Sequence, residues 1–317
     1  MSLGGGRGGL LAWAALRRAL AALGSVLGAT LLLQALVGLA PGDAADLAAN
    51  DAALRDALSA AWGLDEPLLT RWARFVVSAA RGDLGESLTV RPGASVSALI
   101  TASGARSAGL ALAALALGLG LGLPLGFGGA RARRLTLILS AAPVFLALYA
   151  VMTGLNEGAW ALIEAGRIHR PDWFALPDAA SGLRWTIGAC ALAWGSSSLA
   201  ELQGATAEEL GRVYRAPFVL AAQARGEPAW PIALRSLLPP LMEVGASQVA
   251  VVLGGLIVVE RALQLNGAGD LFWRACSQRD LPLACGLAAS AALVVAAARL
   301  LSDLARLWLD PRLREAA

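Results

Sequence analysis

The stretch Leu241–Val259 reads L-M-E-V-G-A-S-Q-V-A-V-V-L-G-G-L-I-V-V, and nearly all of its residues are apolar. A helix of about twenty apolar residues is long enough to cross the hydrocarbon core of a bilayer. Helix is expected here because a segment surrounded by lipid must satisfy its own backbone hydrogen bonds. The stretch therefore predicts a transmembrane helix.

Five further stretches of the same kind occur along the chain. Apolar residues make up 57% of the chain and charged residues 15%, and the mean hydropathy is +0.62. A soluble domain carries about a quarter charged residues, so the surface of this chain is expected to face lipid. The sequence predicts an all-α, polytopic membrane protein with about six transmembrane helices. The six stretches are Leu20–Leu39, Leu110–Phe127, Leu135–Leu155, Trp185–Leu202, Leu241–Val259 and Leu283–Leu304.

The first stretch, which comes directly after Arg17-Arg18, also resembles a signal peptide, but it is longer than the apolar core of such a peptide and five more stretches come after it. It is interpreted as a retained first helix. If the spans alternate, three arginine-rich segments fall on one side of the membrane, and both termini are predicted to be cytoplasmic. The arginines are Arg7, Arg17 and Arg18, then Arg131, Arg133 and Arg134, then Arg306, Arg312 and Arg314.

The opposite side is predicted to hold the long segment Pro41–Arg106, in which Asp and Glu outnumber Arg. Ala53–Leu64 and Pro67–Ala80 have the apolar spacing of helices. Gly82-Asp83-Leu84-Gly85 is typical of a turn. We therefore expect a small extracytoplasmic helical segment over residues 41–106. The apolar face of its second helix is expected to comprise Leu68, Leu69, Trp72, Phe75 and Val76.

Two membrane stretches carry residues that suggest contacts between helices. Gly118, Gly122 and Gly126 recur at every fourth residue, a pattern that lets helix backbones approach closely, within this chain or at a subunit interface. Gln248 lies deep in the fifth stretch, where a polar group is costly. It is expected either to line a translocation path or to bond to another helix. Glu243 of the same stretch is expected to stay solvated.

Few residues suggest catalysis or metal binding. His169 stands alone in a polar connection, and Cys190, Cys276 and Cys285 lack metal-ligand spacing. A basic stripe with interleaved aromatic residues, as in nucleic-acid-binding proteins, is absent from the sequence. The sequence therefore predicts no catalytic residue, no metal site, no nucleic-acid partner and no cofactor of the chain's own.

The connection Gln203–Leu238 is the longest inner loop expected, and it mixes charged residues with compact apolar stretches. Its helical part is expected to end at Gly226, a residue suited to a helix C-cap. Pro228 and Pro231 stiffen the residues that come after this glycine. A loop of this kind in a membrane protein is expected to bind a partner.

At this loop the sequence resembles a known family. Ala222-Gln223-Ala224-Arg225-Gly226 is similar to the T-A-R-A-K-G core of the coupling segment in permeases of the dipeptide, oligopeptide and nickel importers. The resemblance extends over nearly the whole chain, through motifs in the same order and with similar spacing. They are Pro41-Gly42-Asp43, Gly63-Leu64-Asp65-Glu66-Pro67-Leu68, Gly82-Asp83-Leu84-Gly85-Glu86-Ser87, Pro124-Leu125-Gly126, Val258-Val259-Glu260-Arg261-Ala262-Leu263, Gly267-Ala268-Gly269, Gln278-Arg279-Asp280-Leu281-Pro282 and Asp310-Pro311-Arg312.

The resemblance implies the type I fold of ATP-binding-cassette importers and a B-type permease of the bacterial inner membrane, with residues 1–317 forming one transmembrane domain. Its implied partners are a second, C-type permease, two ATP-binding subunits, an extracytoplasmic solute-binding protein and the lipid bilayer. The chain itself would be no enzyme, since ATP-Mg would be bound by the partner subunits. The implied cargo is a peptide or a similar small solute.

The resemblance also implies roles for individual residues. A short coupling helix after Gly226 would enter the ATPase, and the residues shaping this coupling loop within 203–238 would be Ala222, Arg225, Gly226, Glu227, Ala229 and Trp230. The translocation path and its gate would be formed by Gln248, Glu260, Gly267, Gly269 and Asp280.

This chain departs from the family within the same loop. Gly226 reaches Pro239-Pro240 sooner, and Glu208 and Glu209 stand where basic residues are usual. Either the shortened element still binds an ATPase, or the partner permease contributes more to coupling. The alternatives are an ion-coupled carrier or channel, which often has inverted repeats, and a membrane enzyme, which needs a catalytic constellation. Neither feature is visible in the sequence.

Overall fold

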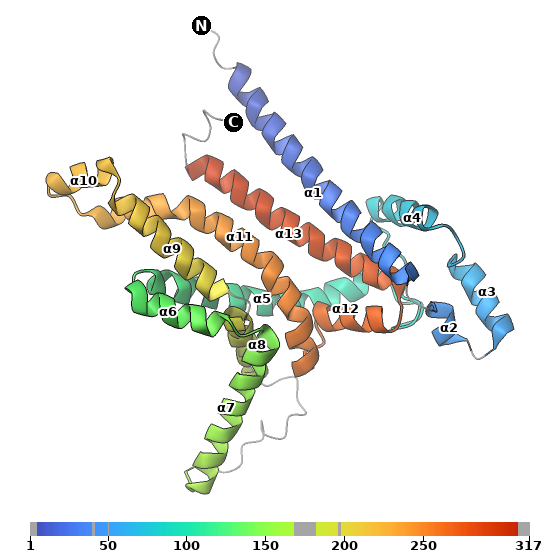
Figure 1. Ribbon diagram of the computed structural model, residues 1–317. Helices are drawn as coiled ribbons and strands as arrows, with labels where there is room; N and C mark the ends of the chain where they lie inside the picture. Colours follow the sequence, from blue (N-terminus) through green and yellow to red (C-terminus); the bar gives the residue numbers. More distant parts are fainter. Residues whose placement is uncertain (1–4, 40–41, 50, 168–181, 196–197, 310–317) are drawn as a thin grey trace. The chain divides into compact units, whose positions relative to one another are not determined.

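The computed structural model describes residues 5–39, 42–49, 51–167, 182–195 and 198–309 (Figure 1). Within these ranges the regular secondary structure is helical, apart from an isolated bridge between Glu86 and Ser95. The prediction of an all-α protein is thereby confirmed. The chain divides into two compact units: unit 1 comprises residues 1–107 and 266–297, and unit 2 comprises residues 108–265 and 298–317.

Four of the described helices are long and apolar enough to cross a membrane. They correspond to the first, second, fifth and sixth predicted spans, and the second begins already at Val96. The apolar segments are Leu16–Leu39 in α1 (Gly5–Leu39), Val96–Gly126 as α5, Ser236–Leu263 in α11 (Ala229–Leu263) and Leu281–Arg306 in α13 (Leu281–Leu309).

The third and fourth predicted spans are not continuous helices. Leu135–Leu155 is divided between α6 (Gly129–Ser140) and α7 (Val144–Glu164), because Pro143, which lacks a backbone N–H, stands at the start of α7. Trp185–Leu202 is divided between α8 (Gly182–Gly195) and α9 (Ser198–Tyr214), and residues 196–197 lie outside the described ranges.

Unit 1 contains α1, α2 (Ala44–Ala48), α3 (Ala52–Trp62), α4 (Leu68–Ala80), α12 (Ala268–Ser277), residues 96–107 of α5 and residues 281–297 of α13. Helices α3 and α4 confirm the two predicted for the outer segment, and residues 96–106 of that segment belong to α5. The Trp72 Nε1–H donates to Thr30 Oγ1 at 3.2 Å and so joins α4 to α1. Of the five residues predicted on one apolar face of α4, Leu69 is 66% exposed, whereas Leu68, Trp72, Phe75 and Val76 are partly buried.

The core of unit 1 lies at the start of α5, the end of α12 and the start of α13. Val96, Ala275, Leu283, Ala284 and Leu287 are buried there, and Leu33 of α1 packs against them. Helix α1 therefore reaches this core through Leu33, near the start of α13.

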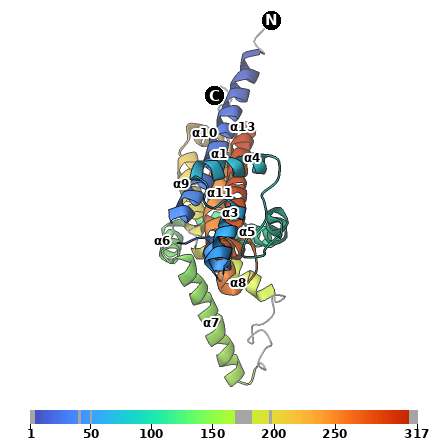
Figure 2. The same ribbon diagram turned by 90° about the vertical axis from the view of Figure 1, so that its right-hand side faces the viewer.

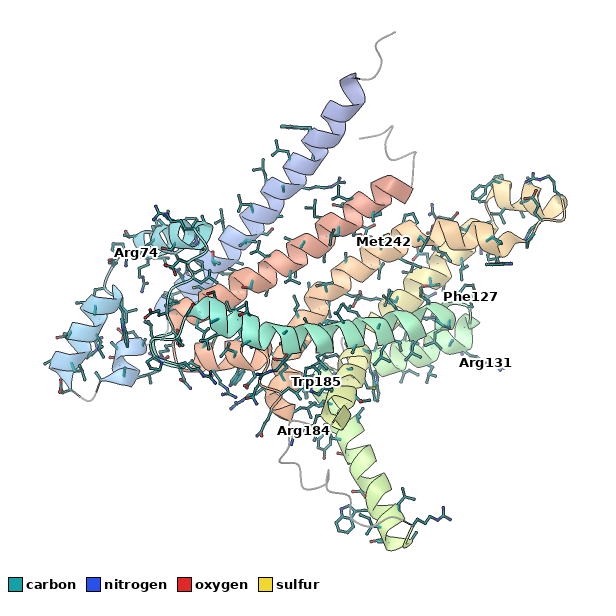
Figure 3. All side chains as sticks on the ribbon, turned by 180° about the vertical axis from the view of Figure 1, so that it is seen from behind. Arg74, Phe127, Arg131, Arg184, Trp185 and Met242 are labelled. Atoms are coloured by element: carbon teal, nitrogen blue, oxygen red, sulfur yellow. The ribbon has the colours of Figure 1, made fainter. Side chains whose placement is uncertain are left out.

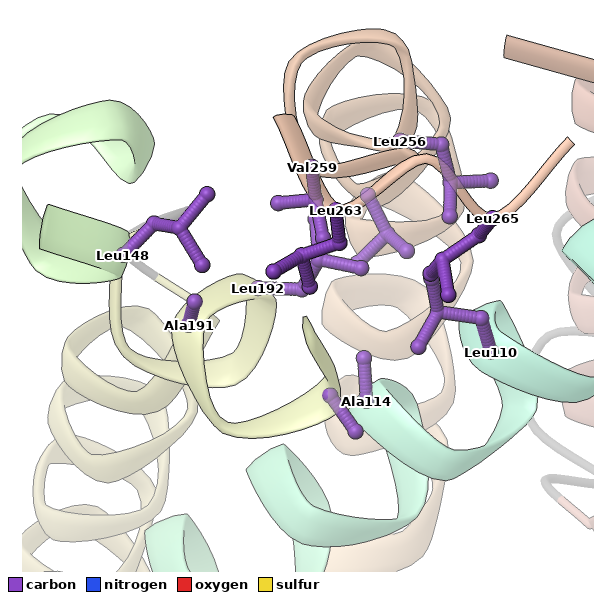
Figure 4. Close-up of a cluster of buried hydrophobic side chains, with 11 residues drawn as sticks. Leu110, Ala114, Leu148, Ala191, Leu192, Leu256, Val259, Leu263 and Leu265 are labelled. Atoms are coloured by element: carbon purple, nitrogen blue, oxygen red, sulfur yellow. The ribbon is translucent and has the colours of Figure 1, made fainter. Parts of the chain in front are cut away.

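Unit 2 has a core built from α5, α7, α8 and α11 (Figure 4). Leu110, Leu148, Leu192 and Val259 are members of this buried cluster. Helix α9 lies along α11 (Figures 1 and 2). Figure 3 places Phe127 and Arg131 close together at the turn that connects α5 to α6, and Arg184 and Trp185 at the start of α8.

The glycine stripe of α5 packs within the chain. A Cβ on Gly126 would lie 2.5 Å from Cβ of Thr206, and a Cβ on Gly122 would lie 2.9 Å from Cβ of Leu202. Both neighbours belong to α9. Gly122 and Gly126 thus favour the intramolecular interpretation of the stripe over a subunit interface.

Candidate functional site

The turn at Gly226 connects α10 (Pro217–Ala224) to α11 in unit 2. Gly226 has φ +81°, its N–H donates to Gln223 O, and the N–H of Glu227 donates to Ala222 O. This pair of bonds is the Schellman motif, which ends a helix with a residue in the left-handed region. The prediction that a helix ends at Gly226 is confirmed.

The charges beside this turn pair with each other. Arg225 Nε donates to Glu227 Oε1 at 2.8 Å, and both side chains are exposed. The hydrogen bond from Arg225 holds the pKa of the Glu227 carboxyl below its usual range. Because these two charges cancel, the net charge of the turn is close to zero. The exposed surface around the turn is therefore mainly apolar.

Large apolar side chains are exposed around the turn. Phe218 is 49% exposed, Leu220 52% and Trp230 65%. Val219 and Ala222 are buried instead, and Val219 packs with Leu210, Val213, Leu237 and Leu241 of α9 and α11. Helix α10 is therefore anchored through Val219 and Ala222, while Phe218 and Leu220 remain exposed on either side of this contact and Trp230 is exposed in the first turn of α11. We call Phe218, Leu220 and Trp230 the turn surface.

The structure has no separate short helix directly after Gly226, in the described residues 226–263, where the coupling helix was expected. The short helix, α10, precedes Gly226, whereas the next helix begins at Ala229 and continues to Leu263. Glu227 and Pro228 precede that helix, with Pro228 at its N-cap. Residues 203–238 accordingly comprise most of α9, then α10, and the first turns of α11. The physical reason is that Pro228 and Pro231 are compatible with the first turn of a helix, where backbone N–H groups have no intrahelical acceptor.

The predicted path residue Gln248 is fully buried, and its Nε2 donates a hydrogen bond to Glu201 Oε2 of α9. This bond between helices is one of the two alternatives expected for Gln248. Glu243 of the same helix is exposed, as expected, and pairs with Arg306 at 2.8 Å. Sequence reasoning did not identify Glu201, although a carboxylate one residue before the end of the predicted fourth span was a signal that could have revealed it.

The predicted gate residue Asp280 is fully buried in unit 1 and holds a loop in place. Its Oδ2 accepts hydrogen bonds from Ser87 Oγ at 2.5 Å and from the backbone N–H groups of Leu88, Thr89 and Val90 at 3.0, 3.1 and 3.1 Å. Its Oδ1 accepts from the N–H of Leu283 at 3.3 Å, which caps α13. Asp280 thus joins the start of α13 to residues 87–90, and Ser87 is its partner that sequence reasoning missed.

The other predicted gate residues lie in two separate units. Gly267 is the N-cap of α12 and Gly269 lies in its first turn, both buried in unit 1. The N–H of Ala268 donates to Ser107 Oγ at 2.7 Å. Glu260 is buried near the end of α11 in unit 2. The structure therefore groups Gly267, Gly269 and Asp280 in one unit, with Gln248 and Glu260 in the other. His169 lies outside the described residues.

A cavity of about 180 Å³ lies within unit 1, between α1, α4, the loop after α4 and the start of α13. Two arginines contribute to its wall. Arg74 pairs with Glu66, while Arg71 donates to Leu64 O at 3.2 Å. Leu281 and Pro282, which come directly after Asp280, also line it. The residues predicted for the path do not line this cavity, as far as the described chain shows.

Comparison with known proteins gives concordant results. The family described as "Binding-protein-dependent transport system inner membrane component" matches residues 114–315. A Brucella ovis protein whose name describes it as a peptide permease is 29% identical over 94% of this chain and 98% of its own length. The Mycobacterium tuberculosis protein named "Oligopeptide transport system permease protein OppB" is 27% identical over 83% of this chain and 85% of its own. The Bacillus subtilis protein named "Dipeptide transport system permease protein DppB" is 30% identical over 34% of this chain and 37% of its own.

Proposed function

The chain belongs to the family of binding-protein-dependent transport system inner membrane components, and from this premise we propose that it is the B-type permease of a peptide importer. As a member it is a multi-pass inner-membrane permease subunit of an ATP-binding-cassette importer, and ATP is hydrolysed by separate subunits. A peptide cargo is supported by the names of relatives that match most of the chain. The B-type assignment rests on the long segment between α1 and α5.

The proposed complex contains this chain, a second permease of the C-type, two ATP-binding subunits and an extracytoplasmic solute-binding protein. Both termini and the turn at Gly226 would face the cytoplasm, and α2, α3 and α4 the outer side. Exposed arginines at 131, 133 and 134 support this orientation, because arginine gathers in cytoplasmic segments. An ion-coupled carrier is disfavoured, since family members are driven by ATP-binding subunits.

The observation that carries the coupling proposal is the turn surface at the start of α11. Helix α11 has 35 residues and is about 52 Å long at 1.5 Å per residue, longer than the hydrocarbon core of about 30 Å. Its apolar span begins only at Ser236. The first turns and the turn surface therefore extend beyond the span, where a soluble ATPase can reach them. A displacement of Trp230 by the ATPase would be transmitted along α11 toward Gln248 and Glu260, which belong to the same helix.

The ATPase contact can be tested by replacing Trp230 with glutamate. Buried aromatic anchors dominate binding energy at protein interfaces, so W230E is expected to lower co-purification of the ATP-binding subunits at least about tenfold, and ATP-dependent peptide uptake with it. Trp230 is exposed, so the variant is expected to insert into the membrane normally. Leu69→Glu is the matched control, because Leu69 is equally exposed at 66% but lies in the outer segment. Normal co-purification of the ATPase with W230E would refute the coupling role of the turn surface.

A further inference from the structure

Glu201 is placed at membrane depth by its contact with α11. Its Oε2 accepts the hydrogen bond from Gln248 Nε2. Gln248 belongs to the apolar span Ser236–Leu263, about 18 Å along the helix from Ser236 and about 22 Å from Leu263 at 1.5 Å per residue. The hydrogen bond holds both side chains at the same depth. The Glu201 carboxylate therefore lies near the middle of the bilayer.

The two bonded side chains differ in exposure. Gln248 is fully buried, whereas Glu201 is exposed on the surface of the chain. Among the described residues, no basic side chain forms an ion pair with Glu201, and its Oε1 has no donor. A carboxylate that faces hydrocarbon at the bilayer centre is strongly unfavourable, and such residues line a watery cavity or meet another protein. The surface that carries Glu201 is therefore not a lipid-facing one.

The neighbourhood of Glu201 leaves room for a ligand. Gly204 lies one turn further along α9, on the same helix face, and the place where a Cβ would stand has no atom within 4 Å. On α11, the residue before Gln248 is Ser247, which is exposed and whose hydroxyl donates to Val244 O. Small and hydroxyl-bearing residues at this depth suit a water-filled passage better than a lipid-facing surface.

We propose that Glu201, oriented by Gln248, binds the positively charged amino group of the solute as it crosses the membrane. The inference rests on the importer function proposed above and names the chemistry of the cargo: a primary ammonium, from a peptide N-terminus or a lysine side chain. An α-amino group has a pKa of about 7.7–8.0 and is mostly protonated at neutral pH. A carboxylate with one oxygen held by an amide and the other open can accept a charge-assisted hydrogen bond from it.

The test compares peptides that differ only in their amino groups. Strains of the source organism would carry wild-type or Glu201→Gln permease on the chromosome, and uptake of labelled trialanine, N-acetyl-trialanine and N-acetyl-Ala-Ala-Lys would be measured. Loss of one charge-assisted hydrogen bond predicts a decrease of about tenfold or more for trialanine, with N-acetyl-trialanine unchanged. A decrease for the lysine peptide would assign the site to any ammonium, and its absence would restrict the site to the N-terminus.

Two further variants separate charge from packing. Glu157→Gln removes an exposed carboxylate of α7 beyond its apolar stretch Val144–Gly154 and is expected to leave uptake unchanged. Glu201→Asp keeps the charge and is expected to retain most trialanine uptake. If wild-type cells do not take up the acetylated peptides, the Glu201→Asp variant becomes the decisive test. A loss of trialanine uptake in Glu201→Asp as large as in Glu201→Gln would then overturn the inference.

The outcomes also distinguish this inference from the proposed function. An equal loss of all three peptides in Glu201→Gln, or less assembled complex on gel filtration, would assign Glu201 to a subunit interface and overturn the inference. Unchanged uptake would overturn it as well. If deletion of the whole gene leaves trialanine uptake intact, the peptide-importer function itself fails, and this inference fails with it.

Discussion

The loop Gly82–Ser95 in unit 1 and the turn Arg225–Pro228 in unit 2, directly before Trp230, are both irregular, and both depend on glycines with positive φ. Gly82 has φ +83° and Gly226 has φ +81°. They differ in their surroundings. The loop is held from outside by the buried carboxylate of Asp280, whereas the turn is held by its own backbone and presents exposed side chains.

The difference indicates what each connection can do. A carboxylate that accepts several hydrogen bonds in a buried site fixes the segment around it, because every donor left unsatisfied would cost free energy. The turn has no such anchor, and its aromatic and apolar side chains remain available to a partner. The loop is therefore expected to be essential for folding, and the turn for coupling.

Removing the anchor of the loop should have the largest effect. Asp280→Asn keeps the shape of the side chain but loses its charge and puts an NH₂ group in place of one acceptor oxygen. We expect a loss of about 3 kcal/mol or more in the free energy of unfolding, measured as a lower Tm and less folded protein in detergent extracts. Asp65→Asn, at an exposed position of the outer segment, is the control. An unchanged Tm for Asp280→Asn would refute the anchoring role.

Replacing Gly82 or Gly226 with alanine is expected to lower the Tm less than Asp280→Asn does, and by the same amount at both positions. A Cβ at Gly82 or Gly226 would meet no atom within 4 Å, so the cost in each case is the left-handed backbone alone, about 1 kcal/mol. Equal decreases in Tm are therefore expected. Only Gly226→Ala should also lower peptide uptake per assembled complex, because it alters the helix end beside the turn surface. Equal uptake by the two variants would remove the functional distinction between loop and turn.

The sequence was sufficient for features that depend on local pattern. Apolar runs predicted the four long spans, and Gly226 was predicted as a helix end because a C-cap glycine has a local signature. The third span was misjudged although a signal, Pro143, was present: hydropathy does not change at this proline, but α7 begins there with Pro143 as its N-cap.

Contacts between distant segments could not be predicted in this way. Ser87 and Asp280 are 193 positions apart, and Glu201 and Gln248 are 47 apart on different helices. Both pairings depend on how helices pack, which a single sequence does not encode in a short motif. For the same reason, the motif that suggests a gate role for Asp280, which stays a prediction, does not reveal the hydrogen bonds by which Asp280 holds residues 87–90.

The smallest effect is expected at the ion pair beside the turn. Because Arg225 lowers the pKa of the Glu227 carboxyl, any stabilisation is present above the usual glutamate pKa of about 4.3 and is lost as the pH falls through the lower value of the folded protein. Between pH 6 and 8, roughly the physiological range, the pair should not titrate. Exposed pairs contribute little to stability, so Glu227→Gln should leave the Tm unchanged throughout this range. A pH-dependent Tm that Glu227→Gln abolishes would show that the turn, like the loop, is held by a carboxylate, and the contrast between the two connections would no longer hold.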